Sequence, residues 1–520
     1  MGAGASFESQ EAARAAGKTQ DEIDAFLNTN KVVAPAAVDK EAPASKDPPT
    51  SSTATASSFD FRTSHKGRLT LSNVFCRIRP FATEGGHSET DEVQAKQLDS
   101  WDDSSVSVAT QFMFSKGKNK YTFPRAVFPP EATQEQVFAG VAPPVIDALT
   151  KVCGTNVVMF AYGQTGTGKT HTMFGPDSSL ASGNFNEQWG LFPRLVHGVF
   201  DTLNKRAAAD GGNTKFIITA SGIEFYLTLA FDLLASNASI IIDRDHKPVG
   251  QTVVRFNDVG DLMPFLDQVR KNRTSRSTKM NSKTDGHDGS SRSHAALILN
   301  IRQLDVSAGK VCETRLTLMD LAGAERPDKP VKQTAKQKKD DDFITMLSAT
   351  GGGGDLRDPI AGLGNISTRA QALVINFELT TLSGEIRKAG ESHRKGKKYS
   401  PPQQNCPDMI KFLGSCFTGK ELMALMVALS PSGNNGWETW FSCQYGTDLA
   451  QLSTPIVYVK AKALDKMLKT AEKKSKEASA KLEKNLKVTK GGALKFRFLF
   501  QCQAKAAESK LMYLKLLSEM

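Results

Sequence analysis

The chain is poor in cysteine, and no pattern suggests a structural use for the few it has. Its 520 residues include seven cysteines, which are scattered, with no C-x-x-C pair and no spacing typical of a metal site. Disulfide-stabilised scaffolds and zinc modules are therefore excluded, and a reducing cytosol is the simpler setting. The sequence also lacks a secretory signal and any apolar run long enough to cross a bilayer. We expect a cytoplasmic protein.

Apolar and acidic residues are also scarce relative to what a compact neutral protein carries. Hydrophobic residues make up 39% of the chain, and the formal net charge is +11. The low apolar content indicates that part of the chain does not pack into a core. The basic excess favours an acidic partner, which could be nucleic acid, an anionic membrane or an acidic protein polymer.

The N-terminal region has no apolar period. Ala, Ser, Thr, Pro and Lys dominate residues 32–58, so we predict a disordered extension over residues 1–68. The first six residues fit the M-G-x-x-x-[ST] pattern, with Gly2 as the acceptor of a myristoyl group. An unmodified start of small residues is an equal alternative, because the pattern is short. One acyl chain would give only weak membrane contact.

The strongest local signal is a glycine-rich loop after an apolar run. Residues 157–160 predict a buried strand, and a G-x-x-x-x-G-K-[ST] motif follows. Small residues let backbone N–H groups point at phosphates, and a helix that starts in the loop adds its positive end. Lys169 is expected to reach the β- and γ-phosphates, and Thr170 to bind Mg²⁺. A turn that binds nothing is the weaker alternative. The predicted nucleotide-binding residues of the loop are Gly163, Gln164, Thr165, Gly166, Thr167, Gly168, Lys169 and Thr170.

Two further motifs stand beside apolar strands. The run S-S-R-S-H at residues 290–294 precedes one strand, and D-L-A-G-A-E at residues 320–325 follows another. Small hydroxyls on a movable loop can serve a γ-phosphate, a water and Mg²⁺, and a carboxylate at a strand end can hold the ion through a water. Alone, the first is most often a solvated turn and the second is weak, but their order after the glycine-rich loop favours one shared site.

Together these motifs resemble the kinesin motor domain. The resemblance rests on R-I-R-P at residues 77–80, A-Y-G-Q-T-G-T-G-K-T-H-T-M at residues 161–173, S-S-R-S-H and D-L-A-G-A-E, and it covers about residues 69–455. It implies an α/β fold of the P-loop NTPase type, with a central mixed, mostly parallel sheet and helices on both faces. Residues 456–520 would then hold a neck-like segment and C-terminal helices.

The resemblance implies ATP and Mg²⁺ as cofactors and assigns roles to matching residues. Arg77, Arg79 and Pro80 would lie beside the adenine ring, with His171 on its other side, since guanidinium and imidazole planes stack on a purine. Glu325 would pair with Arg292 and close the site. The residues expected to act in hydrolysis are Lys169, Ser290, Arg292, Gly323 and Glu325. The residues expected to bind the metal are Thr170, Ser291 and Asp320.

The resemblance also implies microtubules as the partner, and here the sequence departs from the family. Helix 370–386 would carry the main tubulin contact, with Glu378 where Ser is usual. A Lys-, Pro- and Gln-rich segment at residues 390–408 replaces an expected tubulin-binding loop. His287 stands where Asn is usual, and Asn281 is its displaced counterpart if an insertion separates them. Lysines within loop 326–364 are either a tubulin contact or a solvated charge run.

Residues 462–488 predict a basic helix after a neck-linker position at residues 453–460. Its apolar seam is weak, so a lone basic helix is at least as good an interpretation as a coiled-coil homodimer. Residues 504–520 predict another amphipathic helix.

The function that follows is a cytoplasmic, cytoskeletal, ATP-driven microtubule motor, with plus-end movement implied by the motor's place before the neck. A non-motile microtubule-binding protein on the same scaffold is the alternative. A nucleic-acid-dependent ATPase fits the charge but not the motif pair, so no nucleic-acid partner is expected.

Overall fold

The chain divides into two units, residues 1–57 and Ser58–Met520. The computed structural model describes residues 64–65, 68–69, 73–81, 97–109, 119–180, 185–280, 292–324, 342, 345, 368–432, 436–452, 457–488 and 496–520, all in the second unit. Gly2 and most of the predicted disordered extension lie outside these residues. Among the helices described, none is long and apolar enough to cross a membrane.

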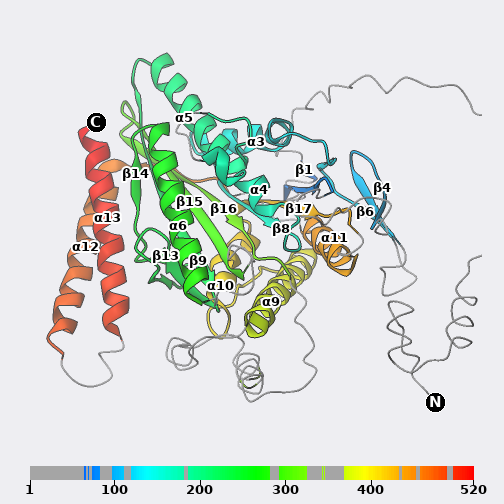
Figure 1. Ribbon diagram of the computed structural model, residues 1–520. Helices are drawn as coiled ribbons and strands as arrows, with labels where there is room; N and C mark the ends of the chain where they lie inside the picture. The colour runs from blue at the N-terminus through cyan, green and yellow to red at the C-terminus, as the bar shows by residue number, and fades with distance from the viewer. Residues whose placement is uncertain are drawn as a thin grey trace, which may run out of the picture. The chain divides into compact units, whose positions relative to one another are not determined.

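A mixed sheet forms the centre of the second unit (Figure 1). Neighbouring strands are parallel from β16 through β8, β17 and β3 to β7. They are antiparallel from β10 through β9 and β15 to β16. This confirms the predicted α/β fold with a mixed sheet. In spatial order its strands are β11 (Ala238–Ser239), β10 (Leu229–Asp232), β9 (Thr214–Tyr226), β15 (His294–Asp305), β16 (Lys310–Asp320), β8 (Asn156–Tyr162), β17 (Glu421–Leu429), β3 (Val74–Ile78) and β7 (Ala126–Phe128), with β14 (Val254–Phe256) beside β9 and β18 (Lys462–Ala463) beside β16.

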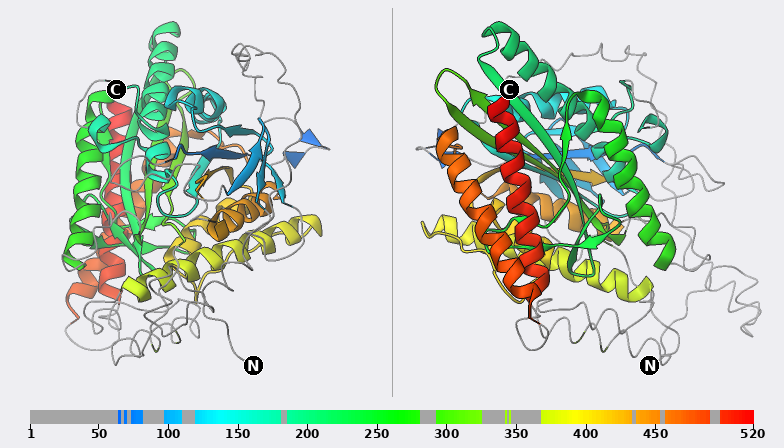
Figure 2. Two further views of the ribbon diagram at one scale, coloured as in Figure 1. Left: turned by 45° about the vertical axis from the view of Figure 1, so that its right-hand side comes forward. Right: turned by 90° about the vertical axis from the view of Figure 1, so that its left-hand side faces the viewer.

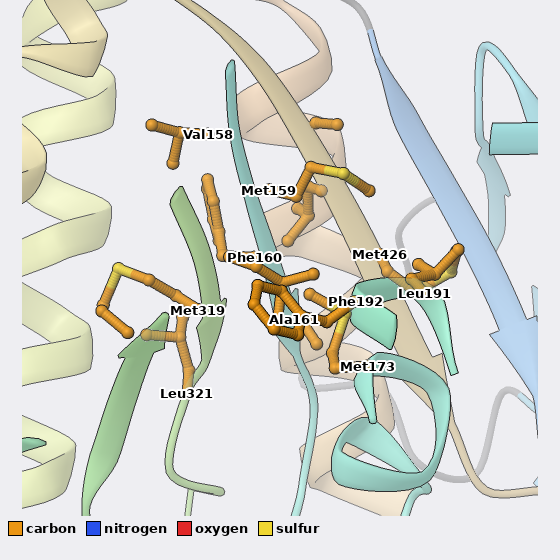
Figure 3. Packing of buried hydrophobic residues seen from close by; sticks show 14 of the residues in the cluster. Val158, Met159, Phe160, Ala161, Met173, Leu191, Phe192, Met319, Leu321 and Met426 are labelled. Carbon is orange, nitrogen blue, oxygen red and sulfur yellow. The ribbon is translucent and has the colours of Figure 1, made fainter. Parts of the chain in front are cut away.

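The central strands lie in the interior of the sheet because their residues are apolar on both faces. All nine residues of β17 are buried, and β8 is buried from Val157 to Tyr162. Continuous apolar runs of this kind suit parallel strands covered on both sides. Phe160 and Ala161 of β8 gather with Phe192 and Met173 in the core cluster that supports the loop after β8 (Figure 3).

Helices cover both faces of the sheet. Phe216 of β9 meets Phe200 on one face, with ring centroids 6.2 Å apart, and Phe225 meets Phe412 on the other, at 5.4 Å. Residues nine apart on a strand point to opposite faces, so these contacts place α5 and α10 on opposite sides. One face carries α3 (Gln134–Thr150), α5 (Leu191–Ala209) and α6 (Leu262–Met280), and the other carries α9 (Thr368–Arg394), α10 (Asp408–Gly414), α11 (Gly436–Ala450), α12 (Leu464–Leu486) and α13 (Arg497–Glu519).

Smaller elements surround this core. A three-stranded sheet is separate from the central one, and two short hairpins lie apart from both. These elements are β4 (Leu98–Trp101), β5 (Ser105–Val108) and β6 (Lys120–Thr122), then β1 (Ser64–His65) with β2 (Arg68–Leu69), and β12 (Ile241–Ile242) with β13 (Pro248–Val249).

Two predicted elements have different bounds. The apolar run at residues 69–80 predicts one strand, but β2 ends at Leu69 and β3 is confined to Val74–Ile78. Apolar residues at helical spacing predict a helix over residues 261–271, whereas α6 spans Leu262–Met280. The second difference matters for the site, because Arg273, which donates to Asp320, lies in the extension.

The C-terminal helices α12 and α13 form an antiparallel hairpin packed against the sheet (Figure 2). Met467 and Ala471 of α12 join Tyr513, Leu514 and Leu517 of α13 in one apolar cluster, which also contains Ile217, Leu304 and Val311 of the sheet. The seam of α12 is thus covered by α13, an arrangement that neither the lone-helix nor the coiled-coil interpretation included. The homodimer stays a prediction.

Polar contacts also hold the hairpin to the sheet. The Tyr513 hydroxyl donates to Val253 O at 3.0 Å, and Lys505 Nζ donates to Thr252 Oγ1 at 3.1 Å. Lys510 lies 3.3 Å from Glu313 of β16. The hairpin is therefore an integral part of this unit.

We expect Leu514→Ala to lower the free energy of unfolding by about 2–5 kcal/mol, because Leu514 is fully buried between the hairpin and the sheet. Thermal unfolding measures this, with the exposed Lys481→Ala on α12 as the control, expected within about 0.5 kcal/mol. Equal melting temperatures for the two variants would contradict the packing.

Candidate nucleotide site

The glycine-rich loop joins β8 to the short helix α4 (Lys169–Met173). Gly166 and Gly168 adopt φ of 81° and 84°, a region that favours glycine. A Cβ on Gly163 would stand 2.3 Å from Ala428 O of β17. The loop therefore closes tightly against the neighbouring strand, as loops that bind phosphate through backbone N–H groups do.

Side chains of the loop hold that shape. Lys169 is buried, and its Nζ donates to Gly163 O at 3.0 Å and Gln164 O at 2.8 Å. Thr167 Oγ1 donates to Gln164 O at 2.8 Å. The lysine thus lies along the loop that was predicted to surround the phosphates.

The segment after β16 lies directly against this loop. Gln164 forms a parallel bridge with Ala324, and a Cβ on Gly323 would stand 2.3 Å from the Thr165 N atom. Only glycine permits so close an approach. The D-L-A-G-A segment and the glycine-rich loop therefore contact each other through their backbones, so a shift of one segment would displace the other.

Asp320 joins all three motifs. The register of β16 and β8 places it opposite Ala161, at the end of two parallel strands. Thr170 Oγ1 donates to Asp320 Oδ2 at 2.7 Å, and Arg273 Nη1 donates to the same oxygen at 2.9 Å. Arg273 Nη2 also donates to Ser293 O at 2.9 Å, in the S-S-R-S-H run.

The residues present fit a magnesium ion shared with phosphates. Asp320 Oδ1 is buried and has no hydrogen-bond partner in the part of the chain that the structure describes, and the Thr170 hydroxyl lies next to the same carboxylate. Mg²⁺ prefers one or two carboxylate or hydroxyl oxygens completed by phosphate and water. No cluster of three His, Cys, Asp or Glu occurs among the described residues, which argues against an all-protein metal cage there.

A cavity of about 470 Å³ opens beside the loop. Its lining includes all four residues predicted to contact adenine, and two from the loop: Arg77, Arg79, Pro80, His171, Thr167 and Gly168. The residues predicted to contact the purine thus line one cavity next to the glycine-rich loop.

Arg77 is held in place inside this cavity. Its guanidinium donates to Gln134 Oε1 at 2.9 Å, Thr172 Oγ1 at 3.0 Å and Ala132 O at 3.2 Å, and burial lowers its pKa to about 10. Burial, and then the charge of Arg77, lower the pKa of His171. The imidazole is therefore neutral at pH 7, which suits contact with an uncharged base.

Other predicted residues cannot be placed in the same way. Ser290, Ser291 and Glu325 lie outside the described residues, as do His287 and the lysines of loop 326–364. Arg292 is buried. Because Glu325 lies outside the described residues, its pairing with Arg292 stays a prediction.

Sequence reasoning missed two polar residues of the site. Arg273 continues the buried stripe of α6, four residues after Val269, so helical spacing could have revealed it if the helix had been extended beyond Lys271. Gln134, the first residue of α3, is buried and its Nε2 donates to His171 O at 2.8 Å. No local motif marks it, because its role arises from tertiary packing.

The fold and the site define a P-loop nucleotide-binding protein of the α/β class. A model of the kinesin motor domain matches residues 77–348. The chain belongs to the kinesin motor domain family.

Several known proteins are similar to the chain. Kinesin-like protein KIN-14H of Arabidopsis thaliana is 34% identical over 280 residues, which are 54% of this chain and 24% of the relative. Kinesin-related protein 7 of Dictyostelium discoideum is 29% identical over 383 residues, which are 72% and 25%. A solved structure described as a fast kinesin aligns with a TM-score of 0.55 and 21% identity, covering 76% of this chain and 95% of that one, which shows the fold. The chain spans about a quarter of the length of these curated relatives.

We expect Arg273→Ala to destabilise the protein by about 3–5 kcal/mol, because it leaves the buried Asp320 carboxylate without its cation. Arg270→Ala is the matched control: this arginine lies on the same helix but is partly exposed, and its loss is expected to cost about 0–1 kcal/mol. Thermal unfolding at low ionic strength compares the two. Similar losses would show that Arg273 does not stabilise Asp320.

Proposed function

We propose that the chain is a microtubule-stimulated ATPase that binds ATP with Mg²⁺. The observation that carries the proposal is the meeting of Lys169, Thr170 and Asp320 at the ends of two parallel strands, beside a cavity of about 470 Å³. Nucleotides bind at this edge of open α/β sheets. Family membership supports the same activity.

Each residue has a proposed task in that reaction. Thr170 and Asp320 would hold the ion together with Ser291, and the ion would neutralise charge on the phosphates. Lys169 would leave its loop carbonyls to contact the β- and γ-phosphates. Gly323 would sense the γ-phosphate through its N–H, and Ser290, Arg292 and Glu325 would order the attacking water.

Microtubules are the proposed partner. The relatives are kinesin-like by name, and the positive net charge suits an acidic polymer. Helix α9, which ends at Arg394, would carry the principal contact. Plus-end movement, a homodimer and weak membrane contact through an acylated Gly2 are finer parts of the proposal.

A second candidate, a microtubule-binding protein that does not step, is favoured by the segment before the hairpin. Val457 N donates to Gly419 O at 3.2 Å, and Val459 N donates to Gly154 O at 2.8 Å. β18 pairs with the start of β16, and the hairpin follows at once. The segment at the neck-linker position is thus bonded to the core and attached to helices that are themselves bonded to the core. Its release would have to expose the apolar cluster of the hairpin.

The ATPase proposal predicts that Lys169→Ala lowers microtubule-stimulated turnover by about 10²–10³-fold, because one cation that stabilises charge on the phosphates is lost. Lys205→Ala, on an exposed turn of α5, is the control and should leave turnover unchanged. Phosphate release with and without microtubules measures both. Turnover that RNA or DNA stimulates, and microtubules do not, would contradict the proposal.

The non-stepping candidate predicts that the amides of Val457 and Val459 stay equally protected from hydrogen exchange with ADP and with a non-hydrolysable ATP analogue. The reason is that the hairpin holds their strand-like segment in both states. A gliding assay run in parallel should then show binding without movement. Loss of protection in one nucleotide state, together with gliding, would favour the motor instead.

A further inference from the structure

His294 connects two loops of the nucleotide site. It is the first residue of β15, directly after Ser293, and it is fully buried. Its Nδ1 accepts a hydrogen bond from Ala322 N at 2.9 Å. Ala322 lies between Asp320 and Gly323, in the segment that touches the glycine-rich loop. His294 therefore ties the S-S-R-S-H run to the D-L-A-G-A segment.

That hydrogen bond also determines where the imidazole proton lies. Because Nδ1 accepts, it carries no hydrogen, and the neutral ring has its hydrogen on Nε2. Nε2 faces helix α9, where Glu378 Oε2 lies 3.4 Å away. The contact therefore brings the imidazole close to a carboxylate without forming a hydrogen bond, and the ring is already fixed on its other side.

Glu378 is an unusual residue for such a position. Its exposed fraction is 1%, and its neighbours Ile375, Leu379 and Leu382 on α9 are buried in the apolar core. Within the described part of the chain, Glu378 Oε1 has no hydrogen-bond partner. A buried carboxylate is unfavourable unless it is paired, so the contact with His294 is its main compensation there.

The length of the contact makes it sensitive to small movements. At 3.4 Å it is longer than an ordinary N–H···O hydrogen bond, so a shift of α9 by a few tenths of an ångström towards β15 would complete the bond. Within the described residues His294 Nε2 has no hydrogen-bond partner, so a shift that completes the bond would satisfy a buried donor, which is favourable. A movement of helix α9 relative to His294 therefore changes the free energy of this contact.

We propose that Glu378 is a positioning residue that couples helix α9 to the nucleotide site through His294. The inference rests on the proposed function, since it supposes that nucleotide occupies the site. A rearrangement around Asp320 and Gly323 passes to His294 through the Ala322 hydrogen bond, and from His294 to α9 through Glu378. Glu378 then links the nucleotide state to α9, the helix that is proposed to contact tubulin.

The test compares hydrogen exchange of α9 amides with bound ADP and with a bound non-hydrolysable ATP analogue, in the full chain without microtubules. Glu378→Met removes the acceptor and keeps the volume, and Glu378→Ala removes both. Glu378→Gln keeps an acceptor for His294 Nε2–H. Glu391→Ala, an exposed acid on the same helix, is the matched control.

We expect a difference in exchange between the two nucleotide states in the wild type, in Glu391→Ala and in Glu378→Gln. In Glu378→Met that difference should fall by at least about threefold, while ADP affinity by calorimetry changes less than about threefold. A residue that merely filled space would give an unchanged difference in Glu378→Met, and this result would overturn the inference. If Glu378→Ala does not fold, Glu378→Met and Glu378→Gln still decide the matter.

Calorimetry separates this inference from the proposed function. Nucleotide binding by the wild type, with a difference in α9 exchange that Glu378→Met leaves intact, overturns the coupling alone. Absence of nucleotide binding by the wild type overturns both.

Discussion

The site depends on the parallel pairing of β8 and β16. This register sets Asp320 opposite Ala161 and so brings the end of one strand to the glycine-rich loop that follows the other. Strands that run antiparallel would put these ends on opposite edges of the sheet. The apolar character of both strands and their cover on two faces maintain the pairing. Every polar contact of the site, including those of Thr170 and Arg273, presupposes it.

Near this pair of strands, several charged side chains are buried away from water. Asp320 and Arg273 are both buried, and Lys169 lies against carbonyl oxygens. Such groups are favourable only while each keeps its partner, so loss of one partner is costly for the other. The same logic holds at Glu378 and His294, which lie farther from the phosphate loop. These buried polar residues lie between the glycine-rich loop and α9, along the proposed coupling.

Much of this arrangement could be predicted from the sequence, because the motifs act locally. The motif from Gly163 to Thr170 needs only a strand before it and a helix after it, and the structure has both. The segment after Asp320 was likewise expected at the same strand edge. The mixed α/β sheet followed from the resemblance, and the family match confirms it.

Other features could not be read from the sequence, because they depend on tertiary partners. Arg273 lies on a helix whose last turns are polar, so apolar periodicity ended the prediction too early. Glu378 looked like a departure from the family, and its partner His294 is 84 residues away in sequence but adjacent in space. The weak seam of α12 left a lone helix and a coiled coil open, whereas α13 of the same chain covers it. In each case the missing information was which surface a side chain would meet.

The central claim is that three separated motifs share one magnesium-bound nucleotide. The most direct measurement is the ADP dissociation constant in Mg²⁺ and in EDTA, for the wild type and for Asp320→Asn. We predict that Mg²⁺ tightens ADP binding by about tenfold or more in the wild type, and that Asp320→Asn loses most of this gain. An equal effect of Mg²⁺ on both proteins, or no ADP binding by the wild type, would contradict the account.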